Sequence, residues 1–376
     1  MKVYLIAGEN SGDYLGSELI LGLKQFYTDT DTDISFFGIG GPLMKDCGLN
    51  SLFPMEELSL MGIFEIFPRL PALIKRRKEV IEDIISVRPD ILITIDSPDF
   101  TLRVAKKIKR MTNIKTIHYV APTVWAWRKG RAEKMSTYID YVLALFPFEP
   151  KILNESGLKS HFVGHPIASY KVASRSEVRQ FRDKYKLEKK KILLVLPGSR
   201  LSEVKRLVGI FEQSLKLVNK RFPNHEFIMP TTGNVEGYVR KATANWIKKP
   251  IIIPSSHESE KKAAFCEADV ALAASGTVSL ELALNVVPMV IAYDMNIFSR
   301  VLLHYLLKID SVCLVNIVSK SKVIPEFIGS RCRPELIANA LSKVMIDKKS
   351  RDSQASVQLN CINLLKPRED SQGKCI

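Results

Sequence analysis

The sequence lacks any long apolar run. No stretch approaches the roughly 20 consecutive apolar residues that a membrane-spanning helix requires, so we expect no segment to cross a bilayer. The apolar start Met1–Ala7 is soon followed by Glu9 and Asp13, which is typical of a first β-strand rather than a secretory signal. We therefore expect the protein to stay in the cytosol.

Cysteine is scarce, and its spacing excludes a metal-binding pattern. The six cysteines form no C-x-x-C pair and have no histidine at ligand spacing, so we expect free thiols and no structural zinc. The G-x-G-x-x-G signature of dinucleotide folds is also missing, which disfavours a nicotinamide or flavin cofactor. Asp29-Thr-Asp-Thr-Asp33 matches the D-x-D pattern of some metal-dependent transferases, but a polar run between a helix and a strand is more simply a solvated loop. We predict no cofactor and no metal site.

Acidic residues are outnumbered by basic ones, 40 to 55, which gives a formal net charge of +15. Such a charge indicates anionic partners: nucleic acid, anionic lipid or a phosphorylated substrate. The basic clusters lack the interleaved aromatics of a single-strand binder and any zinc-finger pattern, so nucleic acid is disfavoured. A solvated surface is the alternative explanation for each cluster.

Strand-like and helix-like patterns alternate along the chain, stop, and then restart. The first series begins at Lys2–Ala7, and the second begins with the apolar strand Lys191–Leu196. The turn-rich stretch Gly164–Ser174 separates them and predicts a linker. Alternation of this kind is typical of parallel α/β sheets, so we predict two tandem doubly wound domains, residues 1–168 and 169–345, then a helix or tail over 346–376. Ligands bind such sheets beyond the carboxyl ends of the strands, and we expect the chemistry between the domains.

The most informative loop is Ser275-Gly-Thr-Val-Ser-Leu-Glu281, between an apolar strand and a helix predicted to begin near Gly276. The first N–H groups of a helix have no intrahelical partner and attract a pyrophosphate, and a glycine allows close approach. Glu281 lies one turn further, where its two oxygens can accept both hydroxyls of a ribose. Ser275, Gly276, Thr277 and Glu281 are therefore predicted to bind a nucleoside diphosphate. The alternative is that Ser275 caps the helix and Glu281 stabilises its first turns.

Two more strand ends carry ionisable groups. Asp96 follows the strand Ile91–Ile95, and because a carboxylate there is costly to desolvate without a partner, we predict that it is a general base. The alternative is a second structural cap beside Ser97-Pro98. Arg200 follows a glycine turn after the strand Lys191–Leu196, and its forked guanidinium suits phosphate oxygens. A surface salt bridge with Glu203 is the less favoured interpretation.

The loop Gly8-Glu-Asn-Ser-Gly-Asp13 follows the first strand and opens the first helix. Its glycines allow a tight turn, whereas Glu9 and Asp13 would repel a bare diphosphate. We predict that Glu9, Ser11 and Asp13 bind a sugar or an acceptor hydroxyl. An ordinary capped turn is the alternative.

A segment rich in large apolar residues spans residues 58–74 and runs directly into four basic residues at 75–78. An apolar segment flanked by cations suits an anionic bilayer surface or the acyl chains of a lipid. A buried core helix with a solvated end explains the pattern equally well. The residues predicted to contact membrane or acyl chains are Ile63, Phe64, Phe67, Lys75, Arg76 and Arg77.

Together these residues resemble the lipid-A-disaccharide synthase family of inverting glycosyltransferases with two Rossmann-like domains (GT-B). The resemblance runs from the first strand to about residue 345 and rests on eight segments in order: Ala7-Gly-Glu-Asn-Ser-Gly-Asp13, Gly38-Ile-Gly-Gly-Pro42, Ile95-Asp-Ser-Pro-Asp-Phe100, His118-Tyr-Val-Ala-Pro-Thr-Val-Trp-Ala-Trp127, Phe146-Pro-Phe-Glu149, Phe162-Val-Gly-His165, Leu196-Pro-Gly-Ser-Arg200, and Ala274-Ser-Gly-Thr277 with Glu281.

The resemblance implies transfer of 2,3-diacylglucosamine from UDP-2,3-diacylglucosamine to the 6-hydroxyl of 2,3-diacylglucosamine 1-phosphate, giving a β-1,6-linked disaccharide and UDP. It implies an acceptor- and membrane-facing first domain, a UDP-sugar-binding second domain, and a peripheral protein on the cytoplasmic face of the bacterial inner membrane. By position, Asp96 takes the base role, Arg200 and Asn316 support the sugar or diphosphate, and Glu281 holds the ribose. Homo-oligomer formation is left open.

Three alternatives are weighed against this prediction. A peptidoglycan N-acetylglucosaminyltransferase shares the architecture but has a glycine-richer first loop with histidine. A UDP-sugar 2-epimerase would use the same nucleotide site without a membrane face. A non-catalytic lipid- or nucleic-acid-binding protein would leave Asp96, Arg200 and Glu281 unexplained.

Overall fold

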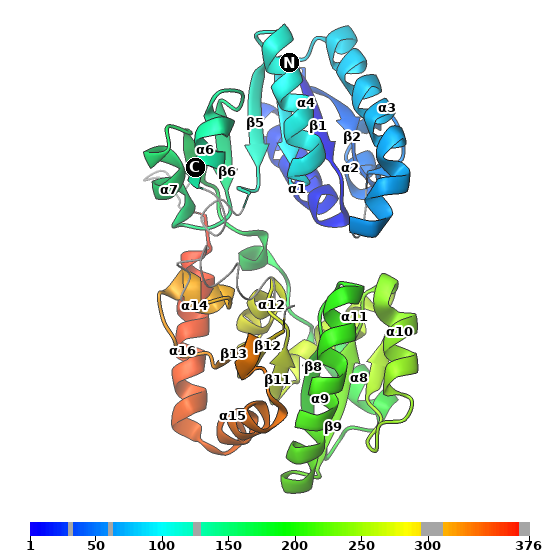
Figure 1. The fold of residues 1–376 in the computed structure, drawn as a ribbon, viewed down its shortest axis with the longest axis vertical. Coiled ribbons are helices and arrows are strands. Elements are labelled where there is room, and N and C mark those ends of the chain that lie inside the picture. The colour runs from blue at the N-terminus through cyan, green and yellow to red at the C-terminus, as the bar shows by residue number, and fades with distance from the viewer. Residues whose placement is uncertain (29–32, 59–62, 123–128, 295–310, 368–376) are drawn as a thin grey trace. The chain divides into compact units, whose positions relative to one another are not determined.

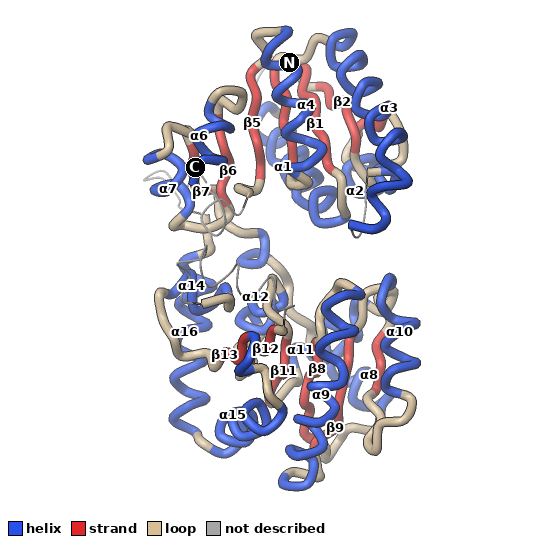
Figure 2. The backbone as a smooth tube through the Cα atoms, in the orientation of Figure 1, coloured by secondary structure: helices blue, strands red, loops and turns tan. Residues whose placement is uncertain are grey.

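The computed structural model describes residues 1–28, 33–58, 63–122, 129–294 and 311–367, with only the helical backbone described for residues 63–70 and 129 (Figure 1). The chain forms two compact units, Met1–Gly164 and His165–Lys366. Each unit is a parallel β-sheet with flanking helices (Figure 2), which confirms the predicted α/β fold class. Among the described residues, every helix is too short or too polar to span a bilayer.

The first unit contains a seven-stranded sheet of order β3-β2-β1-β4-β5-β6-β7, with all neighbours parallel. Its elements follow in chain order: β1 Lys2–Ala7, α1 Asn10–Tyr27, β2 Ser35–Ile39, α2 Pro42–Asp46, β3 Leu49–Ser51, α3 Ile63–Val87, β4 Ile91–Ile95, α4 Pro98–Met111, β5 Lys115–Tyr119, α6 Lys129–Ser136, β6 Tyr141–Ala144, α7 Glu149–Glu155 and β7 Ser160–Phe162.

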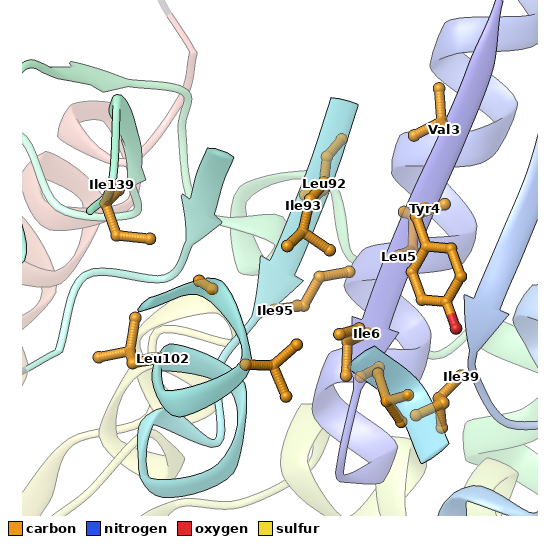
Figure 3. Close-up of a cluster of buried hydrophobic side chains, with 14 of the residues drawn as sticks. Val3, Tyr4, Leu5, Ile6, Ile39, Leu92, Ile93, Ile95, Leu102 and Ile139 are labelled. Carbon is orange, nitrogen blue, oxygen red and sulfur yellow. The ribbon is translucent and has the colours of Figure 1, made fainter. Parts of the chain in front are cut away.

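The central strands of this sheet are buried because helices cover the sheet. From Val3 to Ala7 every side chain of β1 is fully buried, as expected for a parallel strand without polar alternation. Figure 3 shows Val3, Leu5 and Ile6 beside Leu92, Ile93 and Ile95 of β4, with Leu102 of α4 near them. This core fixes the two strands whose ends carry the predicted base and glycine loop.

The second unit contains a six-stranded sheet of order β10-β9-β8-β11-β12-β13, again parallel throughout. Its elements are α8 Arg175–Tyr185, β8 Lys191–Leu196, α9 Leu201–Arg221, β9 His225–Pro230, α10 Gly233–Thr243, β10 Ile251–Ile253, α11 Glu258–Cys266, β11 Val270–Ala273, α12 Val278–Leu284, β12 Met289–Tyr293, α14 Leu314–Ser319, β13 Glu326–Ile328, α15 Pro334–Ile346 and α16 Lys348–Leu364.

The last helix, α16, belongs to the second unit. Two buried glutamines attach it to the start of β12: the Met289 N–H donates to Gln354 Oε1 at 2.8 Å, and Gln358 Nε2 donates to the Val287 carbonyl at 2.6 Å. Residues 348–364 therefore form a closing helix, which is attached by two buried amides as well as by the buried Cys361 and Ile362.

Candidate functional site

In the first unit the strand order reverses between β1 and β4. Ligands of open α/β sheets bind beyond the carboxyl ends of the strands at such a point. The loop Gly8–Ser11 follows β1, and Asp96 and Ser97 follow β4, so both predicted loops lie at this one position. The structure thus brings together two motifs that are more than 80 residues apart in the sequence.

Gly8 is the point of contact between these two loops. A β-carbon at Gly8 would lie 2.7 Å from the Ser97 hydroxyl oxygen and 3.0 Å from its β-carbon. Any residue other than glycine fits there only if Ser97 shifts, because real β-carbons essentially never come closer than 3.0 Å to another heavy atom. The position of Ser97, and of Asp96 beside it, therefore depends on the missing side chain of Gly8.

Asp96 and Ser97 are both held in the left-handed region, with φ of 49° and 44°. The β-branched Val120, after the neighbouring strand β5, has φ of 77°. Non-glycine residues in this region carry strain, and such strain gathers at functional sites. The Asp96 N–H donates to the Tyr119 carbonyl at 3.0 Å. This backbone hydrogen bond fixes the position of the Asp96 backbone, from which its half-buried side chain extends.

Thr101, which the sequence analysis missed, holds the same turn from the other side. Its fully buried hydroxyl lies 2.7 Å from the Asp96 carbonyl and 3.1 Å from the Ser97 carbonyl. Ser97 stands at the N-cap of α4 but makes no side-chain capping bond, whereas Pro98 occupies the first helical turn. The sequence carries no signal for the support by Thr101, because that support depends on the left-handed turn at Asp96 and Ser97.

The structure gives Asp13 a structural role in place of the predicted ligand contact. Its buried carboxylate accepts backbone N–H bonds from Gly41 at 2.8 Å, Leu43 at 3.0 Å and Met44 at 3.1 Å. These are N–H groups at the start of α2, which otherwise lack partners. Glu9 and Ser11 are exposed at the start of α1, so in this loop they, and not Asp13, are accessible to a substrate.

His118 is fully buried near the end of β5, directly before Tyr119, whose carbonyl accepts the Asp96 N–H. Its Nδ1 lies 2.8 Å from the Thr94 hydroxyl, which itself donates to the Ile117 carbonyl. Within the described part of the chain its Nε2 has no hydrogen-bond partner. Burial, with the Arg131 charge nearby, lowers the pKa of His118 to about 3, so the ring is neutral at physiological pH.

In the second unit the strand order reverses between β8 and β11. The loops at this point are Pro197–Arg200, after β8, and the segment from Ala274 to Thr277, after β11. Gly276 has φ of 150°, and no atom of the described residues lies within 4 Å of where its side chain would begin. With respect to those residues the loop is open at this glycine, as close approach of a phosphate requires.

The helix after this loop starts two residues later than predicted. It is α12, Val278–Leu284, with Thr277 at its N-cap and no side-chain capping bond. Ser275 is not a cap, because its hydroxyl donates to the Val312 carbonyl at 2.7 Å. No hydrogen bond of the Gly276 or Thr277 N–H is found among the described residues, which leaves these two donors for a ligand.

Glu281 lies in the first turn of α12 and is partly exposed. One of its oxygens, Oε2, is 2.6 Å from Lys261 Nζ, a contact that sequence reasoning missed. The two residues come from different helices, so no local pattern links them. The carboxylate keeps acceptor sites for hydroxyl groups, because each oxygen can accept more than one hydrogen bond.

Arg200 forms the salt bridge that the sequence analysis considered less favoured. Its Nη1 lies 3.3 Å from Glu203 Oε1, three residues further along at the start of α9. The Arg200 side chain is nevertheless 77% exposed. Since exposed ion pairs are weak, the guanidinium stays accessible to an anion.

Asn316, which the resemblance assigns to the sugar or diphosphate, is 1% exposed. Its Nδ2 donates to the Ile324 carbonyl at 2.9 Å and to Glu326 Oε1 at 2.6 Å, and its Oδ1 accepts the Ile324 N–H at 3.1 Å. The amide thus holds the chain between α14 and β13. Its side-chain groups already bond to Ile324 and Glu326, so any role in ligand binding is an indirect one through these residues.

The basic end of the predicted membrane segment lies on α3. Arg76 forms ion pairs with Glu57 and Glu79, each at 2.7 Å, and its guanidinium lies 4.5 Å from the centre of the Phe53 ring. Lys75 is exposed and Arg77 is partly exposed on the same helix. The side chains of Ile63, Phe64 and Phe67 lie outside the described residues, as do residues 29–32 of the D-x-D run and the tryptophan motif at 123–128.

The described residues contain no group of three or more His, Cys, Asp or Glu side chains placed to hold a metal ion. Their cysteines are free thiols, and burial raises the pKa of Cys313 and of Cys361 to about 12. Neither thiol is therefore ionised near neutral pH.

The fold is similar to solved structures of nucleotide-sugar enzymes. UDP-GlcNAc 2-epimerase from Neisseria meningitidis bound to UDP-GlcNAc aligns with a TM-score of 0.65 at 10% identity, over 97% of this chain and 99% of that one. MurG from Acinetobacter baumannii aligns with a TM-score of 0.52 at 13% identity, over 97% and 99% of the two chains. At these identities the likeness shows the fold alone.

Sequence comparison is more specific. Lipid-A-disaccharide synthase of Ruegeria pomeroyi is 44% identical over 359 residues, 94% of this chain and 88% of the relative. The enzyme of Paramagnetospirillum magneticum is 40% identical over 378 residues, 100% of this chain and 95% of the relative. The family model described as lipid-A-disaccharide synthetase matches residues 3–376. The chain therefore belongs to the lipid-A-disaccharide synthase family of glycosyltransferases.

Proposed function

We propose that this chain transfers 2,3-diacylglucosamine from its UDP carrier to the 6-hydroxyl of 2,3-diacylglucosamine 1-phosphate. The observation that carries the proposal is the match of the whole chain to its family. It is supported by the Asp96 carboxylate where the strand order of the first sheet reverses, and by the Gly276 loop where the order of the second sheet reverses. The family indicates the class of reaction. In each sheet the loops where the strand order reverses supply residues for one part of it, the acceptor in the first unit and the donor in the second.

In this proposal the second unit binds the donor. The N–H groups of Gly276 and Thr277 and the exposed guanidinium of Arg200 hold the diphosphate, and Glu281 accepts the ribose hydroxyls. The charge that develops on the leaving UDP is stabilised by these fixed donors. Since they are cationic or hydrogen-bonding groups of the chain itself, we propose that the reaction needs no metal ion.

The first unit supplies the base. The acceptor 6-hydroxyl attacks the anomeric carbon of the donor while Asp96 takes its proton, so that the new C–O bond forms as the bond to UDP breaks. A single displacement of this kind inverts the anomeric centre and gives the β-linkage. The turn that holds Asp96 is fixed by Tyr119 and Thr101, so the base is oriented before the acceptor binds.

We also propose that the protein is peripheral on the cytoplasmic face of the inner membrane. Both substrates carry acyl chains, and α3 carries exposed Lys75 and partly exposed Arg77, charges that anionic lipid headgroups attract by about 1 kcal/mol each. The apolar residues Ile63, Phe64 and Phe67 precede them on the same helix.

The test is an assay of the full chain with UDP-2,3-diacylglucosamine and 2,3-diacylglucosamine 1-phosphate, with and without chelator. We expect one UDP per disaccharide 1-phosphate, a β-1,6 linkage by NMR, and the same rate with chelator. A 2-epimerase, the alternative suggested by the fold neighbours, would change the donor sugar without forming a disaccharide. Loss of activity with chelator, restored by a divalent ion, would contradict metal independence.

A further inference from the structure

Lys261 of α11 is the direct partner of Glu281. Its Nζ lies 2.6 Å from Glu281 Oε2, and the same ammonium group lies 5.5 Å from the centre of the buried Phe265 ring. Two contacts therefore define where the lysine ammonium group is held. Among the described residues, Glu281 Oε1 has no hydrogen-bond or ion-pair partner, and Oε2 keeps a second lone pair beside the lysine.

This pair borders a hollow in the second unit. Among the residues that line it are Tyr170, Lys261, Phe265, Glu281 and Asn285. Asn285 Nδ2 donates to the Glu281 backbone carbonyl at 2.9 Å, one helical turn along α12. Glu281 is thus held at its backbone by one neighbour and at its carboxylate by another.

The ion pair is poorly placed to stabilise the fold. The side chains of Lys261 and Glu281 are 39% and 29% exposed, and solvent screens pairs of this exposure so that they contribute little to folding. A glutamate side chain, however, has three rotatable bonds, and fixing it in advance removes an ordering cost that binding would otherwise carry. The pair is better suited to orienting the carboxylate.

We propose that Lys261 is a positioning residue for the nucleoside of the donor. It holds the Glu281 carboxylate in one orientation, with oxygens directed to accept the two ribose hydroxyls. The inference rests on the proposed role of Glu281 and adds a residue that determines how tightly UDP is held.

The experiment is titration calorimetry of UDP against the full chain, with donor KM and kcat measured for the same proteins. Lys261→Gln should weaken UDP binding about five- to tenfold, as expected for loss of one charge-assisted contact. It should raise the donor KM by the same factor and leave kcat within about twofold. Its Tm should match the wild type, because the pair is exposed. Lys261→Arg, which keeps a cation, should restore most of the affinity.

Lys262→Gln is the matched control. Lys262 is the next residue of the same helix, lines the same hollow, and pairs with Glu258 at 3.4 Å, so the variant makes the same charge change beside the site without touching Glu281. Equal weakening by Lys261→Gln and Lys262→Gln would assign the effect to general attraction and overturn the proposal. Wild-type affinity in Lys261→Gln, together with weak binding in Glu281→Gln, would overturn the role of Lys261 alone. Failure of the wild type to bind UDP would overturn the donor site itself.

Discussion

Gly8→Ala tests whether the contact between the two loops of the first unit sets the geometry of the base. The new β-carbon would lie 2.7 Å from Ser97 Oγ and 3.0 Å from Ser97 Cβ, whereas ordinary contacts begin at 3.4 Å. Rotation of the hydroxyl relieves the first clash, but the second requires the Ser97 backbone to move by a few tenths of an ångström. Asp96 is joined to Ser97 directly and must follow.

Two effects should result. Overpacking of this kind costs about 1–3 kcal/mol of folding free energy, which lowers Tm by several degrees. Misplacement of a catalytic group is more damaging to rate than to stability, and we expect kcat to fall about 10- to 100-fold. UDP affinity should be unchanged, because the predicted donor residues belong to the second unit. The assays are UDP release, thermal melting and UDP titration.

Ser97→Gly supplies the decisive comparison. It removes both atoms that the new methyl group would meet, and a glycine tolerates the φ of 44° at this position. The double variant Gly8→Ala/Ser97→Gly should therefore recover most of the lost turnover. Gly22→Ala is the control. Gly22 lies in α1, and no atom of the described residues lies within 4 Å of where its β-carbon would be. This variant should be neutral or slightly stabilising. A double variant as slow as Gly8→Ala alone would refute the reasoning.

Three further predictions concern stability, pH and membrane binding. Asp13→Asn should lower the free energy of unfolding by about 2–4 kcal/mol and leave UDP affinity unchanged, since its carboxylate holds α2; a change in donor or acceptor affinity at unchanged Tm would restore its ligand role. His118 is neutral when folded, with a pKa of about 3, and titrates near 6.5 when unfolded, so its contribution is present above pH 6.5 and is lost as the pH falls. Between pH 6.5 and 5, His118→Gln should therefore lose up to about 2 kcal/mol less stability than the wild type, and an equal loss of unfolding free energy in the two proteins, measured by denaturant titration at the two pH values, would contradict this. Phe64→Ser/Phe67→Ser should weaken sedimentation with anionic vesicles, and unchanged sedimentation would exclude these residues from the membrane contact.

The sequence patterns predicted the sheets well for a physical reason. A strand buried on both faces needs an uninterrupted apolar run, so β1, β4 and β8 were predicted with the bounds that the structure gives. Since parallel strands end at one edge of a sheet, the sequence also predicted that Asp96 follows the end of a central strand.

Contacts between distant residues were not predictable in this way. The partners of Asp13 are 28 to 31 residues away, and Lys261 is separated from Glu281 by a whole strand. No local periodicity encodes such pairs, so Asp13 was interpreted as a ligand residue and Lys261 was not identified. The left-handed turn at Asp96 and Ser97 was also missed, because it depends on the empty space at Gly8 and on the Thr101 hydroxyl.

We propose that Asp96 acts on the acceptor while the second unit binds the donor independently. A paired measurement on Asp96→Asn tests this: kcat for disaccharide formation and the dissociation constant for UDP. We expect kcat to fall about 10²-fold or more, as for the loss of a general base, with UDP affinity and Tm unchanged. Near-normal turnover, or a fall explained by lost UDP binding, would contradict it.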